Sequence, residues 1–202
     1  MADATLATDK KRLRALALGR RAAMGEDARR LASRAAAANA VTALDHAVGP
    51  VAGRTVALFV PFRDEIDTLP LAELLRAAGA ELALPVILGR DRPLIFRRWR
   101  ADDSLVPAGA FRISEPPEIA PEVVPEAVLV PLAAFDRRGY RIGYGAGFYD
   151  RTLAGLRARG RVVALGFAFA CQEVEAVPVA PHDEPVDMMV TETEAVLVAP
   201  SP

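Results

Sequence analysis

Glycine and arginine gather in one stretch of the chain, residues 135–151, in a pattern that suits the binding of phosphate. The stretch contains Gly139, Gly143, Gly145, Gly147, Arg138, Arg141 and Arg151. Glycine lets the backbone approach a ligand closely, and successive N–H groups of such a loop can enclose an anion. Arginine adds fixed positive charge, and a helix expected from Asp150 adds its positive N-terminal end. The stretch predicts a phosphate-binding loop, while an irregular structural loop with glycines at tight turns stays open as the alternative.

This loop matches neither of the common nucleotide-binding motifs. It has no Gly-Lys-Ser/Thr, which a Walker A loop requires, and the third glycine of Gly143-x-Gly145-x-Gly147 is wrongly spaced for a Rossmann fingerprint. The spacing alone therefore does not name the nucleotide.

The elements around the loop predict how it is positioned. Residues 127–130 read as a buried strand that Pro131 ends, and open α/β sheets bind ligands at the carboxyl ends of their strands. Further strands are predicted at 55–60, 81–88 (interrupted or ended at Pro85), 94–99, 161–167, 187–191 and 195–198. Helices are predicted at 8–44 (with a break near Gly25), 69–78 and 150–159, and loops at 101–126 and 135–149.

Apolar strands that alternate with helices predict a single α/β domain. We expect a three-layer, Rossmann-like architecture with a mostly parallel or mixed central sheet and helices on both faces. The domain spans residues 1–202, with 1–7 and 200–202 frayed at its ends.

Composition excludes several other classes of protein. The chain has 202 residues, is 52% hydrophobic and carries a net charge of -1, so no global attraction to nucleic acid or membrane is expected. No apolar run is long enough to span a membrane, and no secretion signal is visible. Cys171 is the only cysteine, which excludes an internal disulfide, and with two histidines a zinc site is not expected. We expect a cytoplasmic protein and favour a monomer.

Five blocks of sequence, in order from Lys10 to Glu192, carry a family resemblance. They are Lys10–Arg14; Pro61–Thr68; Gly109 with Ile113–Pro116; Val130-Pro131, Phe135-Asp136 and Arg141–Arg151; and Gln172, Pro178, His182-Asp183, Val186-Asp187 and Thr191-Glu192. On these residues the chain resembles the 5-formyltetrahydrofolate cyclo-ligase family, also called methenyltetrahydrofolate synthetase. The fourth block is highly specific, whereas the others are individually weak. The main departures are Ala146, where many relatives have glycine, and Asp67, where some have glutamate.

The resemblance implies the chemistry. ATP with Mg²⁺ phosphorylates the formyl oxygen of 5-formyltetrahydrofolate, N10 attacks the activated carbon, and 5,10-methenyltetrahydrofolate, ADP and phosphate leave. The protein's share is mainly positioning and charge neutralisation, and no protein nucleophile is required. Cys171 is therefore expected to be a small buried hydrophobe.

The resemblance also implies the site residues. ATP is expected to meet Lys10, Lys11, Arg14, Arg141, Ile142, Gly143, Tyr144, Gly145, Ala146, Gly147, Phe148 and Tyr149. The folate is expected to meet Phe62, Glu65 and Asp67 together with Tyr144, Gly145, Ala146, Gly147 and Phe148. Magnesium is expected at Asp150 and Asp187, because it prefers oxygen ligands. Without the resemblance, Lys10 and Arg14 would read as a solvated basic helix face.

Other functions remain open beside this one. A sugar-phosphate isomerase or acyl-CoA transferase of similar architecture would not need ATP, and Asp150 and Asp187 would then lack a purpose. A non-catalytic relative that only binds folate or nucleotide would keep the same pocket. A nucleic-acid-binding module is disfavoured by the balanced charge.

Overall fold

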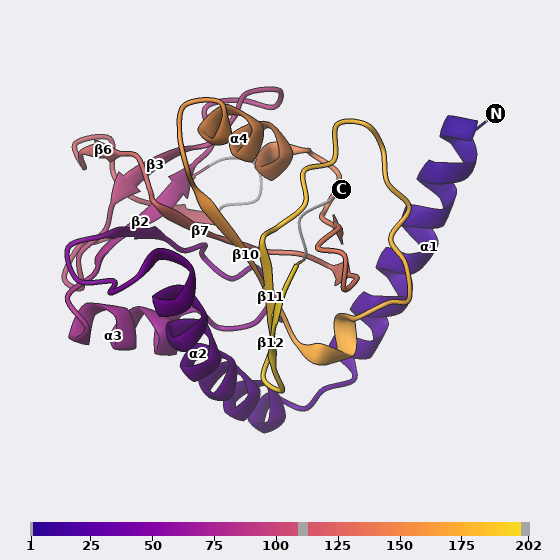
Figure 1. Cartoon of the computed structure of the whole chain (residues 1–202), viewed down its shortest axis with the longest axis horizontal. Coiled ribbons are helices and arrows are strands. Elements are labelled where there is room, and N and C mark those ends of the chain that lie inside the picture. Colours follow the sequence, from indigo (N-terminus) through magenta and orange to yellow (C-terminus); the bar gives the residue numbers. More distant parts are fainter. Residues whose placement is uncertain (1, 109–112, 199–202) are drawn as a thin grey trace.

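The computed structural model describes residues 2–108 and 113–198, which form a single α/β domain around an eight-stranded sheet (Figure 1). The strand order is β12-β11-β10-β7-β1-β2-β3-β6. Its strands are β1 (Thr55–Ala57), β2 (Glu81–Val86), β3 (Ile95–Arg98), β6 (Glu122–Val123), β7 (Ala127–Val130), β10 (Val163–Phe167), β11 (Met188–Val190) and β12 (Ala195–Leu197). The helices are α1 (Ala2–Ala22), α2 (Glu26–Val48), α3 (Leu69–Ala77) and α4 (Phe148–Arg157).

Five neighbouring strands of the sheet, from β11 through β10, β7 and β1 to β2, are parallel, and the strands outside them are antiparallel. Every residue of β7 and β10 is buried, as expected for parallel strands with both faces covered. The predicted mixed, three-layer sheet is confirmed. Parallel strands end at the same edge, so the segments that follow β1, β2 and β7 emerge together.

Helices cover the two faces of the sheet. In β7, Ala127 and Leu129 face the layer of α2 and α3, while Val128 and Val130 face the layer of α4, because side chains alternate along a strand. Leu44 of α2 with Leu71 and Leu75 of α3 fill the first core, and Leu153 of α4 enters the second. Figure 1 shows α4 on the opposite side of the sheet from α2 and α3.

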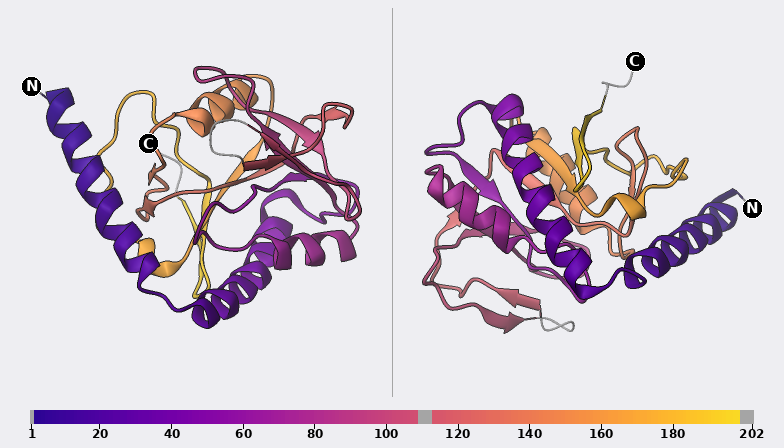
Figure 2. Two further views of the ribbon diagram at one scale, coloured as in Figure 1. Left: turned by 180° about the vertical axis from the view of Figure 1, so that it is seen from behind. Right: turned by 90° about the horizontal axis from the view of Figure 1, so that it is seen from below.

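Helix α1 lies outside these layers and extends away from the body of the domain (Figure 2). Its Ala17 packs in a third, smaller core with Ala134, Ile142, Val174 and Val177. Gly25 precedes α2 as its N-terminal cap, which confirms the predicted break between the two helices. No helix in the described part of the chain is long and apolar enough to cross a membrane.

Several predicted boundaries were wrong. Helix α1 begins at Ala2, so the segment 2–7, predicted to be frayed, is helical; residues 200–202 lie outside the described residues. Pro85 lies within β2, where it pairs with Phe96, instead of ending the strand.

Both segments predicted as loops contain short strands. Residues 101–126 include the hairpin β4 (Val106–Ala108) and β5 (Ile113–Glu115) as well as β6, and residues 135–149 include most of the hairpin β8 (Ala134–Phe135) and β9 (Arg141–Ile142). Strands of two or three residues are too short to show an alternating pattern. Gly109, with residues 110–112, lies outside the described residues.

Gly139 in the β8–β9 turn offers a test of this packing. Its φ is +81°, and a Cβ there would lie 2.5 Å from the carbonyl oxygen of Val186. We expect Gly139→Ala to lower the free energy of unfolding by about 2 kcal/mol or more, from positive-φ strain and the backbone clash together. Denaturant unfolding measures this.

Gly155→Ala is the matched control, because Gly155 lies in α4 with no atom within 4 Å of a Cβ built on it. We expect it to raise the free energy of unfolding by up to about 1 kcal/mol, since alanine is the better helix former. Equal effects of the two substitutions would contradict the packing at Gly139.

Candidate active site

A cleft of about 580 Å³ opens at the carboxyl ends of the parallel strands, a size typical of small-molecule sites. Phe59 and Val60 after β1, Pro85 and Ile87 around the end of β2, and Pro131 after β7 form its base. Helix α1 and the glycine loop, residues 143–147, form one side. The glycine loop thus lies where the sequence placed it, beside the end of β7.

The structure brings most of the predicted site residues into this cleft. Those that line it are Lys10, Arg14, Phe62, Glu65, Arg141, Ile142, Gly143, Tyr144, Gly145, Ala146, Gly147, Phe148, Tyr149 and Asp150. Three predicted residues, Lys11, Asp67 and Asp187, do not line it.

Lys10 and Arg14 of α1 line the site, whereas helical spacing alone predicted only that they share one face of the helix. Lys10 forms an ion pair with Asp183, and Arg14 donates from Nε to the carbonyl oxygen of Gly143 at 2.7 Å. Arg21, one to two turns further along, is 2% exposed and donates to the hydroxyl of Tyr144 at 3.1 Å. Lys11 is exposed on a different face, so it is out of reach of this wall.

The glycine loop has the backbone that its composition predicted. Gly145 and Gly147 have φ values of +98° and +64°, a region that favours glycine, while Ala146 has an ordinary conformation. Helix α4 begins at Phe148, directly after the loop, so its positive N-terminal end faces the cleft.

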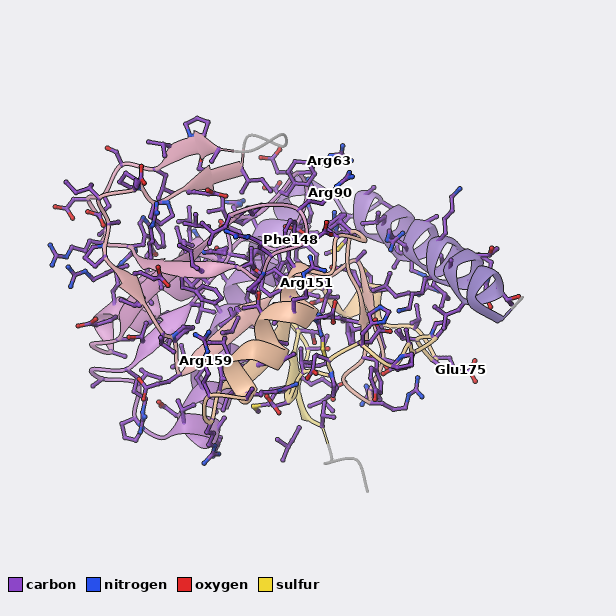
Figure 3. All side chains as sticks on the ribbon, turned by 90° about the horizontal axis from the view of Figure 1, so that it is seen from above. Arg63, Arg90, Phe148, Arg151, Arg159 and Glu175 are labelled. Carbon is purple, nitrogen blue, oxygen red and sulfur yellow. The ribbon has the colours of Figure 1, made fainter. Side chains whose placement is uncertain are left out.

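Two of the three arginines predicted to bind phosphate instead make hydrogen bonds or ion pairs with other residues of the chain. Arg151 donates to the carbonyl oxygens of Ala146 and Arg90, at 2.6 and 3.0 Å, and its guanidinium lies over the ring of Phe148. Figure 3 shows Phe148 and Arg151 together at the start of α4 with Arg90 nearby. Arg138 pairs with the buried Asp136, outside the cleft.

Arg141 is the arginine of this stretch that reaches the cleft. Its guanidinium pairs with Asp150 at 2.8 Å and donates to the carbonyl oxygen of Glu184. Burial lowers the pKa of Arg141, and the charge of Asp150 opposes that shift. The side chain stays a fixed cation, because an arginine pKa lies far above neutrality.

Asp187 lies at the opposite edge of the sheet from the cleft, so the structure does not bring it together with Asp150. Its carboxylate accepts a hydrogen bond from the backbone of Ala164, near the start of β10, and pairs with Arg157 at the end of α4. Asp150 lies in the first turn of α4, seven residues before Arg157, which is about 10 Å along the helix axis.

Asp67 is placed at the start of α3 instead of in the cleft. Its carboxylate accepts from the backbone N–H of Leu69 at 2.9 Å, and its own N–H donates to Ser33. A short side chain that satisfies a free N–H at a helix start is a common cap. The cleft carboxylate of this loop is therefore Glu65.

Glu65 belongs to a connected polar network beneath the cleft. Its carboxylate accepts from the hydroxyl of Tyr144 at 2.7 Å and from the backbone of Phe62 at 2.8 Å. Arg21 donates to Tyr144 and pairs with Asp64 at 2.8 Å. Burial raises the pKa of Glu65, and burial together with Glu65 raises the pKa of Tyr144 to about 12, so Tyr144 remains a hydrogen-bond donor.

The family of the chain follows from comparison with known proteins. The model of the 5-formyltetrahydrofolate cyclo-ligase family matches residues 7–192. This chain belongs to that family.

Named relatives and solved structures agree with the family match. The chain is 38% identical over 146 residues to the 5-formyltetrahydrofolate cyclo-ligase of Escherichia coli K12, covering 70% of this chain and 79% of that protein. It is 35% identical to the Mycolicibacterium smegmatis enzyme of the same name, covering 66% of this chain and 71% of that protein. The NMR structure of Aquifex aeolicus 5,10-methenyltetrahydrofolate synthetase superposes with a TM-score of 0.72 at 29% identity, covering 96% of this chain and 94% of that one.

Three residues in the cleft or directly beneath it received no role from the sequence. Arg21 was visible as part of the basic face of α1, but nothing indicated its bond to Tyr144. Asp183 pairs with Lys10 across 173 residues. Glu115 is a buried carboxyl whose pKa is raised by burial and which accepts from the backbone of Ile87. Contacts this distant in sequence leave no local signal.

Cys171 is only partly buried, although the sequence predicted a buried hydrophobe. It packs beside the first core, its thiol approaches the sulfur of Met24 at 3.5 Å, and burial raises its pKa. A thiol with a raised pKa stays protonated and unreactive near neutral pH.

The raised pKa of Glu65 predicts a pH-dependent stability. Between the ordinary carboxyl pKa and the raised native value, the native state binds more protons than the unfolded state, so stability falls as pH rises through that window. Glu65→Gln removes this dependence. We therefore expect the unfolding free energy of the variant, relative to the original protein, to increase with pH from about 4 to 7.

Denaturant unfolding at several pH values measures this difference. Glu73→Gln, on the exposed face of α3, is the control and should show no such trend. A gap between Glu65→Gln and the original protein that stays constant with pH would show that the Glu65 carboxyl titrates normally.

Proposed function

We propose that this chain catalyses the ATP-dependent cyclisation of 5-formyltetrahydrofolate to 5,10-methenyltetrahydrofolate, with release of ADP and phosphate. The observation that carries this is a single cleft that combines a cationic glycine loop with an apolar end. Lys10, Arg14 and Arg141 lie on the loop side, and Leu94 and Ile113 line the cleft together with Ile87. A triphosphate and a flat ring system with apolar faces need these two surroundings next to one another.

The reaction fits what these residues can do. The formyl oxygen is a poor leaving group until a phosphoryl group is transferred to it, after which N10 attacks the carbon and phosphate departs. Lys10, Arg14 and Arg141 would neutralise the phosphates, and the N–H groups of the loop and of the first turn of α4 would orient them. Phe62 would offer an aromatic surface to the folate ring, and Glu65 or Glu115 would accept its hydrogen bonds.

Magnesium fits this site through one carboxylate. In the described part of the chain, Oδ1 of Asp150 accepts hydrogen bonds from Arg141 and from the backbone N–H of Glu184. The second carboxylate oxygen, Oδ2, is therefore left to bind a cation. No group of three or more acidic, histidine or cysteine side chains is present among the described residues, so a cage built only from protein does not occur there. Magnesium typically takes one or two carboxylates, waters and substrate phosphates, and would supply charge neutralisation during phosphoryl transfer.

The remaining predictions about the molecule belong to the same proposal. We expect residues 1–202 to act as one catalytic domain, with no nucleic-acid or membrane partner, and as a cytoplasmic monomer. Light scattering of the purified protein measures the oligomeric state directly.

The decisive assay mixes the protein with 5-formyltetrahydrofolate, ATP and Mg²⁺ and follows the near-ultraviolet absorbance of the methenyl product. Absorbance that rises only with all components present supports the proposal. No product, with neither ATP nor folate bound, would refute it.

Two adjacent lysines, Lys10 and Lys11, test whether the cationic side of the cleft binds the phosphates of ATP. Lys10→Ala is expected to lower kcat/KM for ATP by roughly 10- to 100-fold, because it removes a charged contact worth about 1.5–3 kcal/mol. Lys11→Ala removes the same charge from an exposed face and is expected to change kcat/KM by less than about twofold. Equal losses in both variants would contradict the contact assigned to Lys10.

Two aspartates test the metal site in the same way. Asp150→Asn is expected to raise the Mg²⁺ concentration needed for half-maximal activity by about tenfold or more, because it replaces a charged ligand with a neutral one. Asp187→Asn is expected to leave that concentration unchanged, since Asp187 lies at the other edge of the sheet. A shift in Asp187→Asn alone would place the metal elsewhere.

A further inference from the structure

Ring closure releases a proton that the activation step does not account for. N10 carries one hydrogen in the substrate and none in the methenyl product. There it is bonded to the bridging carbon, and the bonding electrons are delocalised over N5, that carbon and N10. When N10 attacks, it becomes a cationic amine, and its proton must leave. A basic group beside the reacting carbon would raise the rate of this step.

We propose that Glu65 is the general base that takes the N10 proton during ring closure, and that Tyr144 and Arg21 position it. This rests on the proposed function and assigns Glu65 a catalytic role beyond contact with the folate ring. The step is balanced: the N10 lone pair forms the new C–N bond, the C–O bond breaks with its electron pair on phosphate, and the N10–H proton moves to a carboxylate oxygen of Glu65.

The position of Glu65 supports this role. Tyr144 lies between Gly143 and Gly145 in the loop proposed to hold the phosphates, and its hydroxyl donates to Glu65 at 2.7 Å. The formyl oxygen must lie next to the phosphates in order to accept the phosphoryl group. A carboxylate bonded to this loop is therefore beside the reacting formyl group, and both N5 and N10 flank that group.

The surroundings of Glu65 suit a base better than a passive acceptor. Each carboxylate oxygen has one protein donor, Tyr144 or the backbone of Phe62, and each retains a lone pair for a substrate proton. Burial raises the pKa of Glu65, which makes it a stronger base than an exposed carboxylate. Tyr144 stays protonated and cannot take the proton in its place, because its own pKa is raised to about 12.

Arg21 explains why this arrangement is rigid. It is 2% exposed, lies beneath the cleft, and holds Tyr144 through one nitrogen and Asp64 through another. A buried cation with two fixed partners holds the phenol in one orientation, so the hydroxyl points at Glu65. Arg21 is thus a positioning residue, which acts on the reaction through Tyr144.

Glu115 is a buried carboxyl that also lines the cleft, and it provides the internal comparison. It accepts from the backbone of Ile87 near the end of β2 and makes no hydrogen bond to the glycine loop in the described part of the chain. The same substitution at Glu115 therefore tests whether any buried cleft carboxyl suffices or whether the bond to Tyr144 matters.

The test separates activation from ring closure in a single turnover. Enzyme in excess is mixed with 5-formyltetrahydrofolate, labelled ATP and Mg²⁺, and ADP and the methenyl absorbance are followed in parallel. For Glu65→Gln we expect ADP to form at a rate within a few-fold of the original protein while methenyl formation falls by about 10²- to 10⁴-fold. In Glu115→Gln we expect ADP and methenyl product to stay coupled.

Three results would overturn the assignment. Methenyl formation at the original rate in Glu65→Gln would show that no base is needed there. A parallel loss of ADP and methenyl product would place Glu65 in binding or activation. Uncoupling in Glu115→Gln instead would move the base to Glu115. Failure of the proposed function looks different, since the original protein itself would then form neither product.

A second measurement guards against a merely structural effect. In Glu65→Ala, added formate or acetate can enter the vacated space and accept the proton, so we expect methenyl formation to recover with the concentration of the added carboxylate. Chloride at equal ionic strength is the control. Equal recovery of methenyl formation with the carboxylates and with chloride would reject general-base catalysis by Glu65. So would no recovery with any of these anions, if ADP and methenyl formation also stay coupled in Glu65→Gln.

Discussion

The hydrogen bonds between helix α1 and the glycine loop are the constraint on which the site depends. Helix α1 lies outside the layers of the sheet and makes a small apolar contact of its own through Ala17 and Leu13. Arg14 donates to the carbonyl oxygen of Gly143 and Arg21 to the hydroxyl of Tyr144, both in the loop. Lys10 forms an ion pair with Asp183. The same side chains that would neutralise phosphate thus also hold the wall of the cleft in place.

This double use explains the distribution of charge in the cleft. Arg141 and Asp150 pair directly, and so do Lys10 and Asp183, so two of the three cleft cations have a carboxylate partner before any ligand arrives, while Arg14 donates to the carbonyl oxygen of Gly143. Pairing reduces the cost of holding buried charges close together. A triphosphate would enter a site whose cations are already oriented, which lowers the entropic cost of arranging them.

The sequence predicted the sheet, its helices and the main loop correctly because these features leave local patterns. Buried parallel strands such as β7 read as continuous apolar runs, and four glycines beside a strand end mark a loop that approaches a ligand. The basic face of α1 followed from helical spacing alone. Short hairpins such as β8–β9 were not predicted, because a strand of two residues cannot show an alternating pattern.

The predicted site aspartates that the structure leaves outside the cleft share one cause. Asp67 and Asp187 were chosen because they match family positions, but which way a carboxylate points depends on neighbours that are distant in sequence. Asp67 turns to the start of α3, and Asp187 turns to Arg157 and the backbone of Ala164. The pairing of Glu65 with Tyr144 joins residues 79 apart, and only the folded chain shows it.

The ends of the sheet carry a consequence for how the molecule behaves at high concentration. On one side the sheet finishes in β6, which has two residues and lies between Pro121 and Pro125. Proline has no N–H to donate, and so short a strand offers few unpaired groups to a neighbour. A second chain has little template there for extending the sheet, so this edge resists the pairing of copies into aggregates.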